Sequence, residues 1–266
     1  MIPKKIHFIF GLKEDEGGKE FSYFHYLNIL SAKRVNPEYE INFYYQYEPR
    51  AYWFQELKKQ EINFIKLDNV KDEVNGVQFN NYAHKADYLR LEILRDKGGI
   101  YLDTDVVCVK PFDPLLKLGC VLGYESVNNI VWGLPNFTIL SEENNIFINK
   151  WIEEYAEEYP YVKDDWAFGA VKLPYLIYQN NLDIVNTVSP EFFSFYGWDE
   201  ASHYHMFDNV GPIYPAYSIH LWESRWWDNL KNISQDYLFE NDSTITRIYR
   251  RFALGDSRIE FPDYWQ

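Results

Sequence analysis

The hydrophobic and polar residues of the first hundred positions follow two periods in turn. Short apolar runs, which are typical of strands, are separated by longer stretches in which apolar residues recur every three or four positions, as in helices. In chain order, this pattern predicts a strand at Lys5–Phe10, a helix at Phe21–Val35, a strand at Ile41–Tyr47, a helix at Ala51–Lys59, a strand at Ile62–Leu67 and a helix at Asn81–Lys97. Such alternation favours an α/β fold with a mostly parallel, Rossmann-like sheet and helices on both faces.

The last of these helices is followed by the segment GGIYLDTDVV, from Gly98 to Val107. Gly98 and Gly99 stand where helices commonly end in a left-handed residue. The apolar residues that follow predict one buried strand, which includes Asp103 and Asp105. Because strand side chains alternate with a period of two, we expect both carboxylates on one face of this strand. They would lie near its carboxyl end, where parallel sheets bind ligands.

The pattern becomes less regular in the second half of the chain. It predicts a strand at Val121–Glu125 and helices at Asn145–Glu158, from Asp164 to about Tyr178, and at Thr244–Phe252. Asp164 and Asp165 are expected to cap the second of these helices. The stretch from Asn186 to Trp227 is rich in aromatic residues and only weakly periodic. Since there is no repeat, low-complexity segment or linker, we expect residues 1–266 to form a single domain.

The composition narrows the possible functions. Hydrophobic residues make up 47% of the chain, which excludes disorder, and 26 basic against 40 acidic residues give a net charge of −14. We therefore expect neither nucleic acid nor an anionic lipid surface as a partner. No apolar run has the length of a transmembrane helix, so we expect a soluble cytoplasmic protein, with peripheral membrane contact left open. Because of this negative charge, a phosphorylated ligand could bind only with the help of a local positive charge such as a metal ion.

Asp103 and Asp105 form a D-x-D motif for which several functions are conceivable. A calcium-binding EF-hand loop is excluded, because Cys108 and Pro114 stand where its glycine and final glutamate belong. Paired acid/base catalysis is less favoured, since such carboxylates usually come from separate elements. A divalent cation, Mn²⁺ or Mg²⁺, would relieve the repulsion and leave positions open for phosphates. Two solvated carboxylates at a strand end remain the alternative.

Asp87 and Arg90 lie upstream on the predicted helix. They are three positions apart and share a helical face. Near a metal-binding strand end, this carboxylate and guanidinium could hydrogen-bond to sugar hydroxyls. Taken alone, the pair is better explained as an ordinary surface ion pair.

The stretch Ala83–Val106 resembles the sugar-binding region of glycosyltransferase family 32, and more distantly the glucosyltransferase domain of the large clostridial toxins. The shared pattern is A-D-x-x-R, a helix, two glycines, a tyrosine-containing strand and D-x-D. Its positions in this chain are Ala86, Asp87, Arg90, Gly98, Gly99, Tyr101, Asp103 and Asp105. The resemblance implies a GT-A glycosyltransferase fold, with residues 1–110 binding a nucleotide sugar and residues 111–266 forming the acceptor-side and C-terminal part.

Three further segments extend the resemblance. The segment Ile2–Gly11 is similar to the opening strand of the family, and by analogy Phe8 and Phe10 would contact the nucleotide, with Phe10 stacking on the base. The motif HLWESRWW resembles the family's C-terminal ending, in which His220 would join the metal while Ser224 and Trp226 face the diphosphate. Asn136 loosely matches an asparagine placed at the donor sugar or acceptor.

The resemblance implies a metal-dependent retaining glycosyltransferase that moves a hexose from a nucleotide sugar to a glycan or another hydroxyl acceptor. In this interpretation Asp103, Asp105 and His220 hold Mn²⁺ or Mg²⁺. Catalytic roles fall to Asp87, Arg90 and Asn136, and donor contacts to Phe8, Phe10, Asp87, Arg90, Tyr101, Asp103, Ser224 and Trp226. A UDP-sugar is favoured over GDP-mannose because the opening segment resembles that of the toxins.

Three alternatives belong to other classes. A metal-dependent hydrolase of a nucleotide sugar or phosphate ester would use Asp103, Asp105 and His220 without an acceptor. A non-catalytic carbohydrate-binding module would use the aromatic residues alone. A glycogenin-like family 8 transferase is less compatible with the spacing of Asp87 and Arg90.

Overall fold

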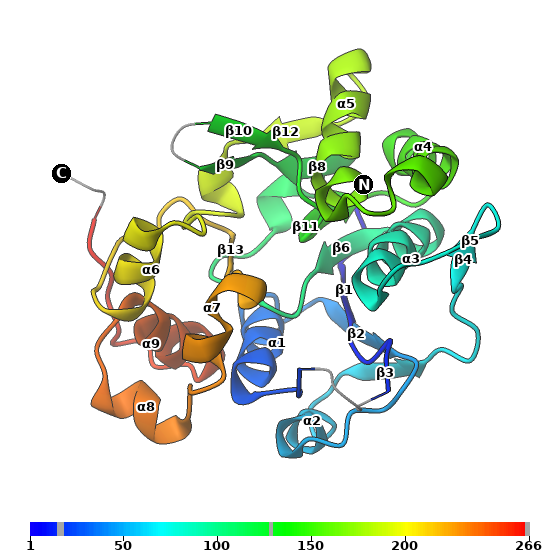
Figure 1. The fold of residues 1–266 in the computed structure, drawn as a ribbon. Coiled ribbons are helices and arrows are strands. Elements are labelled where there is room, and N and C mark those ends of the chain that lie inside the picture. Colours follow the sequence, from blue (N-terminus) through cyan, green and yellow to red (C-terminus); the bar gives the residue numbers. More distant parts are fainter. Residues whose placement is uncertain (15–18, 128–129, 264–266) are drawn as a thin grey trace.

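The computed structural model describes residues 1–14, 19–127 and 130–263, and seven strands of this part form a central sheet (Figure 1). Their order across the sheet is β12-β8-β11-β6-β1-β2-β3. The strands are β1 (Lys5–Ile9), β2 (Glu40–Tyr45), β3 (Asn63–Lys66), β6 (Gly99–Leu102), β8 (Cys120–Gly123), β11 (Thr138–Ser141) and β12 (Asn186–Val188). β11 is antiparallel to both of its neighbours and the other pairs are parallel, which confirms the mostly parallel sheet.

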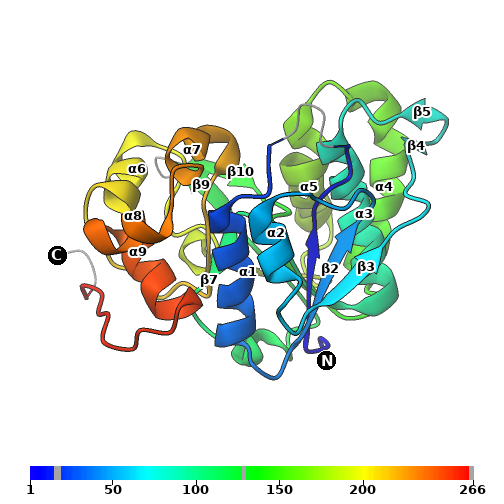
Figure 2. The ribbon, with the colours of Figure 1, turned by 90° about the horizontal axis from the view of Figure 1, so that it is seen from below.

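Helices cover both faces of this sheet, as predicted (Figures 1 and 2). On one side lie α1 (Tyr23–Val35), α2 (Tyr52–Leu57) and α9 (Thr244–Ile248), and on the other α3 (Tyr82–Lys97), α4 (Ile146–Val162) and α5 (Leu173–Asn180). The alternation of side chains along β6 divides two hydrophobic cores. Ile100 and Leu102 belong to the core that contains α1, whereas Tyr101 belongs to the core that contains α3 and α4.

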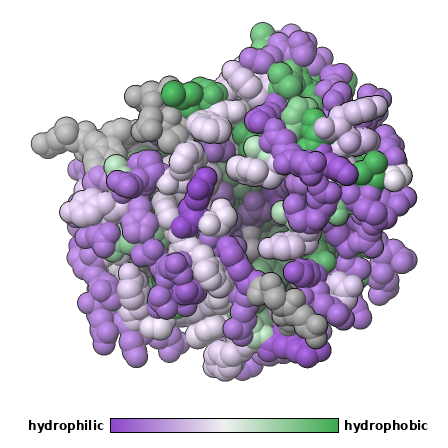
Figure 3. Space-filling model, viewed as in Figure 1, coloured by the Kyte–Doolittle hydropathy of each residue, from purple (hydrophilic) through white to green (hydrophobic). Residues whose placement is uncertain are grey.

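Several shorter elements surround the sheet, and the sequence did not predict them as separate elements. They are the hairpins β4 (Glu73–Val74) with β5 (Val77–Gln78) and β9 (Glu125–Val127) with β10 (Ile130–Gly133), the pair β7 (Val106–Cys108) with β13 (Ser218–His220), and the helices α6 (Glu200–Phe207), α7 (Glu223–Leu230) and α8 (Gln235–Glu240). Most of these elements have few residues and lie in segments with weak periodicity, so the pattern offers little signal for them. The face of the molecule seen in Figure 3 is mainly hydrophilic.

Helix α3 has the boundaries that its sequence indicates. The Asn81 side chain caps it by accepting hydrogen bonds from the backbone N–H groups of Ala83 and His84, at 2.9 and 3.1 Å. The helix ends at Gly98, whose φ of 56° lies in the left-handed region. A Cβ atom at this position would lie 2.8 Å from the backbone nitrogen of Glu143. Glycine is therefore required here both by conformation and by space.

The prediction of one strand through Asp103 and Asp105 is wrong. β6 ends at Leu102, and the chain turns so that the Val106 N–H donates to the Asp103 carbonyl at 3.0 Å. β7 then leaves the central sheet and pairs with β13 instead. The turn, rather than the alternation of a strand, brings the two carboxylates together. The buried apolar residues on both sides of the turn gave the same signal as a continuous strand.

The other predicted elements are confirmed with shifted boundaries. The helix predicted to end at Glu158 continues to Val162, and the helix predicted from Asp164 to about Tyr178 consists of a π-helical turn at Phe168–Lys172 followed by α5. Just before that turn, Asp165 accepts a hydrogen bond from the Ala167 N–H at 3.2 Å. The predicted strand Val121–Glu125 is divided between β8 and β9. The late helix continues beyond α9 as a π-helical turn at Tyr249–Ala253. Among the helices that the structure describes, none combines the length and apolar character that crossing a bilayer requires.

The sheet topology places several loops along one edge. β6 is parallel to β1, and β6 and β8 are both antiparallel to β11, so the carboxyl ends of β1, β6 and β8 share an edge. β11 begins at the same edge. The residues found there are therefore, in spatial order, Phe10 after β1, Asp103 after β6, Asn136 before β11 and Glu125 after β8.

Candidate active site

This edge of the sheet opens into a cavity of about 680 Å³. Its walls come from the end of β1, the first turns of α3, the β6–β7 turn, the β9–β10 hairpin and the start of α7. The volume lies within the range of about 300–1,000 Å³ that is typical of small-molecule sites. The parallel strands thus direct their terminal loops to one binding site, as in other α/β sheets.

Asp87, Arg90 and Asn136 form a buried polar network in the wall of the cavity. One oxygen of Asp87 lies 3.0 Å from an Arg90 guanidinium nitrogen and accepts a hydrogen bond of 2.8 Å from the Asn136 amide. Arg90 also donates to the Asn136 backbone and side-chain oxygens at 2.9 and 3.1 Å. Asp87 and Arg90 are only 7% and 4% exposed, so the alternative of a surface ion pair is excluded.

Burial and the neighbouring charges shift the pKa values of this network in opposite directions. Burial raises the pKa of Asp87 above its ordinary value, and the neighbouring Arg90 and Asn136 only partly oppose this effect. Burial alone would lower the pKa of Arg90, but Asp103, Tyr101 and Asp87 raise it above the ordinary value. The guanidinium therefore keeps its positive charge in the interior, where it is compensated by two carboxylates.

Arg90 also connects this network to the D-x-D motif. Its guanidinium lies 2.9 Å from Asp103 Oδ1 and 4.4 Å from the centre of the Tyr101 ring. The Tyr101 hydroxyl donates to the same Asp103 oxygen at 2.8 Å. The position of the Asp103 carboxylate is consequently fixed by two donors from different elements, α3 and β6.

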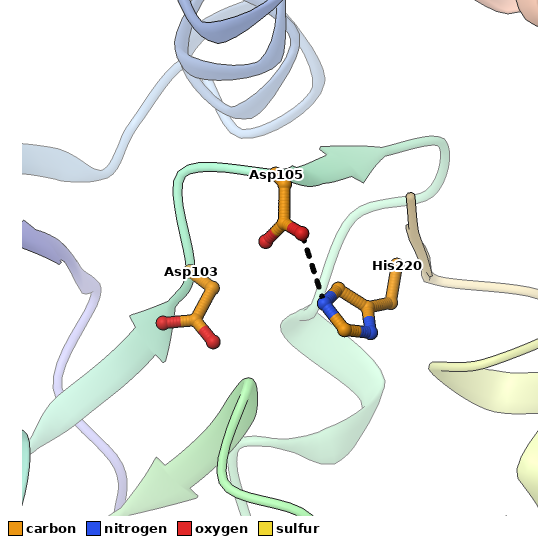
Figure 4. A group of neighbouring side chains, drawn as sticks. All are labelled: Asp103, Asp105 and His220. Atoms are coloured by element: carbon orange, nitrogen blue, oxygen red, sulfur yellow. Dashed lines mark ion pairs between the residues drawn. The ribbon is translucent and has the colours of Figure 1, made fainter. Parts of the chain in front are cut away.

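Asp103, Asp105 and His220 converge in the cavity from two separate parts of the chain (Figure 4). Antiparallel pairing of β13 with β7 sets His220 opposite Val106, directly beside the turn. Its Nε2 atom lies 3.1 Å from Asp105 Oδ2. The ring is stacked on Phe137 with centroids 4.2 Å apart. Its Nδ1 atom is buried and has no hydrogen-bond partner among the described residues.

The three side chains fit a site for a hard divalent cation. One ligand atom from each of them can be chosen so that all lie within 4.8 Å of one another. Adjacent ligand atoms about 2.1 Å from one ion are about 3 Å apart, which matches the distance between His220 and Asp105. Carboxylate oxygens are suitable ligands for Mn²⁺ or Mg²⁺, an imidazole is a ligand more typical of transition metals, and the three side chains would leave positions for phosphate oxygens.

Burial alone would raise the pKa of Asp105, but the His220 imidazole and the N–H of Glu223 lower it below its ordinary value. The Glu223 N–H donates to Asp105 Oδ2 at 2.8 Å. For His220, burial would lower the pKa, and Asp105 raises it above its ordinary value. Asp105 is thus a carboxylate at neutral pH, as a metal ligand must be.

The two phenylalanines of the opening segment have different environments. Phe10 lines the cavity and makes edge contacts with Phe21 and His25, at centroid distances of 5.2 and 5.3 Å. Phe8 is fully buried in the core on the α1 side of the sheet. The structure therefore brings Phe10, but not Phe8, to the expected nucleotide end of the cavity.

The C-terminal motif is similarly divided. Ser224 lines the cavity at the start of α7. Trp226 is buried against His203 and Phe207 and does not face the cavity. Trp222, which the sequence analysis did not select, lines the cavity instead and lies 4.2 Å from His220, ring to ring. Of the tryptophans in this motif, the one nearest to the histidine in sequence is the one that lines the cavity.

Several further cavity residues were not selected from the sequence. Among them are Glu125, Trp132, Trp166 and Trp198. The available signal was the general excess of aromatic residues, most of which were expected to belong to the core. Glu125 lies outside every motif and is only 7% exposed. Burial raises its pKa, while His220 and a hydrogen bond from Trp198 oppose this effect.

Comparison with known proteins shows the class of fold to which this cavity belongs. The solved structure of the PaToxG glycosyltransferase superposes with a TM-score of 0.50 over 95% of this chain and 87% of that chain, at 18% sequence identity. The fold is that of the GT-A glycosyltransferases, in agreement with the sequence-based expectation.

Sequence comparison then defines the family. Residues 23–121 match the model described as "Glycosyltransferase sugar-binding region containing DXD motif". "Glucan organizing enzyme 1" of Cryptococcus neoformans var. grubii is 30% identical over 282 aligned positions, which cover 100% of this chain and 74% of the relative. The chain belongs to this family of DXD glycosyltransferases.

A bacterial relative supports the similarity to toxin domains. A protein named "Toxin" from Photorhabdus asymbiotica is 34% identical over 110 residues. The match covers 40% of this chain and only 4% of the toxin. It therefore concerns one region of a much larger protein.

Proposed function

We propose that this glycosyltransferase uses a divalent metal ion, Mn²⁺ or Mg²⁺, to transfer a hexose from a nucleotide sugar with retention of configuration. The observation that carries this proposal is the convergence of Asp103, Asp105 and His220 in one cavity with the buried Asp87–Arg90–Asn136 network. Both groups lie at the carboxyl edge of the sheet, where the topology directs a ligand.

The order of the residues along this edge suggests how the donor lies. Phe10, after β1, would stack against the base, and the diphosphate would lie near Asp103 and Asp105, after β6. The hexose would then reach Asn136, before β11, and Asp87 on α3. Asp87 accepts hydrogen bonds, and the side-chain oxygen of Asn136 can do so as well. These groups are suited to hold hydroxyls in a fixed orientation.

The proposed ligands of the ion are Asp105, Asp103 and His220. When bound, the ion would supply Lewis-acid stabilisation of the negative charge that develops on the leaving diphosphate. Arg90 holds Asp103 in place through its 2.9 Å contact, and Ser224 at the start of α7 offers a hydroxyl to the phosphates. In a chain with a net charge of −14, a bound cation also offsets the repulsion of an anionic donor.

The remaining details rest on the family resemblance. Retention of configuration follows the resemblance to family 32, in which the acceptor attacks from the face that the diphosphate leaves. A UDP-sugar is favoured over GDP-mannose because the segment Ile2–Gly11 resembles the toxin segment. A glycan or another hydroxyl compound is the proposed acceptor, and the name of the fungal relative, which refers to glucan, is consistent with a glycan.

The test is a panel of UDP-glucose, UDP-galactose, UDP-N-acetylglucosamine and GDP-mannose, assayed with Mn²⁺ for release of nucleoside diphosphate. We expect release from a UDP-sugar, abolished by a chelator and lowered at least about 100-fold in Asp105→Asn. The matched control is Asp113→Asn, which changes an exposed carboxylate outside the cavity. Release that persists with the chelator or in Asp105→Asn would contradict the proposal.

A further inference from the structure

The cavity continues beyond Asn136 to a group of residues without a role in the donor site. Glu125, Trp132, Trp166 and Trp198 all line it, and we call this group the tryptophan end. Glu125 and Trp132 come from the β9–β10 hairpin, whereas Trp166 and Trp198 lie far along the chain, before α5 and before α6.

The sheet topology places Glu125 on the side away from the nucleotide. Crossing the sheet from β1, the strands are β6, β11 and β8, and Glu125 follows β8 by two residues. Neighbouring strands are about 4.8 Å apart, so β8 lies about 10 Å beyond β6. A donor that extends from Phe10 past Asp103 to Asn136 would therefore end with its hexose next to the tryptophan end. This is where the second substrate must enter.

The tryptophans present unusually large apolar surfaces to solvent. Trp132 is 49% exposed and Trp166 is 69% exposed. Trp132 contacts Trp198 edge to face, with centroids 6.0 Å apart and planes at 76°. The Arg225 guanidinium lies 4.9 Å from the centre of the Trp198 ring. Single exposed apolar residues scattered over a surface are ordinary and need no explanation. Several exposed indoles in one cavity, by contrast, indicate a ligand with flat apolar faces.

Glu125 adds a polar group beside these rings. Its side chain lines the cavity although only 7% of the residue is exposed, and Trp198 hydrogen-bonds to it. A carboxyl group is costly to bury unless it is hydrogen-bonded, and it can accept from hydroxyl groups. A sugar ring offers both of the required features, a face of C–H groups for an indole and a rim of hydroxyls for a carboxylate. The hydroxyls of Ser and Thr carry no comparable flat face, and the flat ring of Tyr carries a single hydroxyl, with none left for Glu125 once it acts as the acceptor.

We propose that the tryptophan end is the acceptor subsite and that the acceptor is a carbohydrate, one ring of which stacks on Trp132 and Trp198 while a hydroxyl binds Glu125. This inference rests on the proposed function. In the transfer, the bond from the hexose C1 to the diphosphate oxygen breaks and its electron pair stays with the diphosphate. The acceptor oxygen bonds to C1, and its proton passes to the departing phosphate oxygen. Glu125 accepts from a second hydroxyl of the same ring and so positions the acceptor.

The experiment measures transfer from the preferred nucleotide sugar, with Mn²⁺, to cellobiose, maltose, laminaribiose, lactose, chitobiose and their monosaccharides. A peptide containing Ser, Thr and Tyr provides the competing class of acceptor. We expect transfer to at least one sugar and none to the peptide. Trp132→Ala, Trp198→Ala and Glu125→Gln should each raise the acceptor KM by about tenfold or more. UDP affinity in the presence of Mn²⁺ should stay within about twofold, which shows that the donor site is intact.

Phe239→Ala is the matched control, because Phe239 is 66% exposed but lies on α8 outside the cavity. It should leave the acceptor KM unchanged. Transfer to the peptide alone, no transfer to any sugar, or an unchanged KM in all three variants would overturn the acceptor assignment. Failure of the unmodified protein to bind UDP with Mn²⁺ would instead contradict the proposed function, so the two failures are distinguishable.

Discussion

At the scale of single residues, Arg90 organises the site. Its planar guanidinium contacts Asp87, Asn136 and Asp103 at once, and its face lies over Tyr101. The sequence could predict that Arg90 shares a helical face with Asp87, because their spacing fixes it. It could not predict the completion of this network by Asn136, since that depends on where β11 begins in the sheet.

Replacing Arg90 by lysine tests this organising role. An ammonium group keeps the charge but cannot form the same set of directed hydrogen bonds, so buried acceptors would lose their partners. We expect Arg90→Lys to lower the free energy of unfolding by about 2 kcal/mol, measured by urea denaturation. The control Arg95→Lys changes an arginine that pairs with Asp96 near the surface and should cost less than about 0.5 kcal/mol. Equal effects of the two changes would contradict the account.

At the scale of elements, the sequence predicted the parts of the fold whose signals are local. The alternation of strands and helices, the start of α3 near Asn81 and the glycine that ends it all depend on residues close in sequence. The break after Leu102 was missed because a buried turn has the same hydrophobic pattern as a strand. The pairing of β7 with β13 joins segments more than a hundred positions apart, and nothing local specifies it.

The end of α3 provides a test of local backbone conformation. Gly98→Ala would place a Cβ atom 2.8 Å from the Glu143 nitrogen and 2.9 Å from Pro3 Cδ, at a φ of +56°. Gly76→Ala is the matched control, since Gly76 has a φ of +74° with no atom within 4 Å. We expect about 1 kcal/mol of destabilisation in the control and at least about 2 kcal/mol more in Gly98→Ala. Similar midpoints of thermal unfolding would refute this explanation.

Strand β1 carries a buried histidine that should make stability depend on pH. His7 Nε2 is 2.8 Å from the Gly98 carbonyl oxygen, and Nδ1 is 3.3 Å from the Tyr44 hydroxyl. Burial lowers its pKa from 6.5 to about 4. Below pH 6.5 the unfolded chain therefore binds a proton at His7, which the folded chain binds only near pH 4. The contribution of His7 to the free energy of unfolding is complete above pH 6.5 and decreases as the pH falls towards 4.

The expected loss from His7 is about 3 kcal/mol over this interval, measured as the free energy of unfolding in urea at several pH values. In His7→Gln the free energy of unfolding should depend less steeply on pH, whatever the absolute stability of the variant. His203→Gln, which changes a partly exposed histidine, serves as the control and should keep the slope. A slope in His7→Gln equal to that of the unmodified protein would show that the explanation is incorrect.

At the scale of the whole molecule, the sheet sets the order of the site. Parallel strands bring Phe10, Asp103 and Glu125 to one edge, and the C-terminal segment adds His220 and Ser224 from the opposite end of the chain. The family resemblance selected most of the residues that the proposed function assigns to the donor site. The tryptophan end escaped prediction because its residues come from three separate segments that only the folded chain brings together.

The most direct test of the central claim is calorimetric titration of UDP with and without Mn²⁺, using the unmodified protein and Asp105→Asn. Asparagine keeps an oxygen that can accept from the Glu223 N–H, so the fold should be preserved, and thermal unfolding checks this point. The account predicts that UDP binds with Mn²⁺, that binding is lost with a chelator, and that Asp105→Asn weakens it by at least about 10-fold. Equal UDP affinity with and without Mn²⁺, or unchanged affinity in Asp105→Asn, would contradict it.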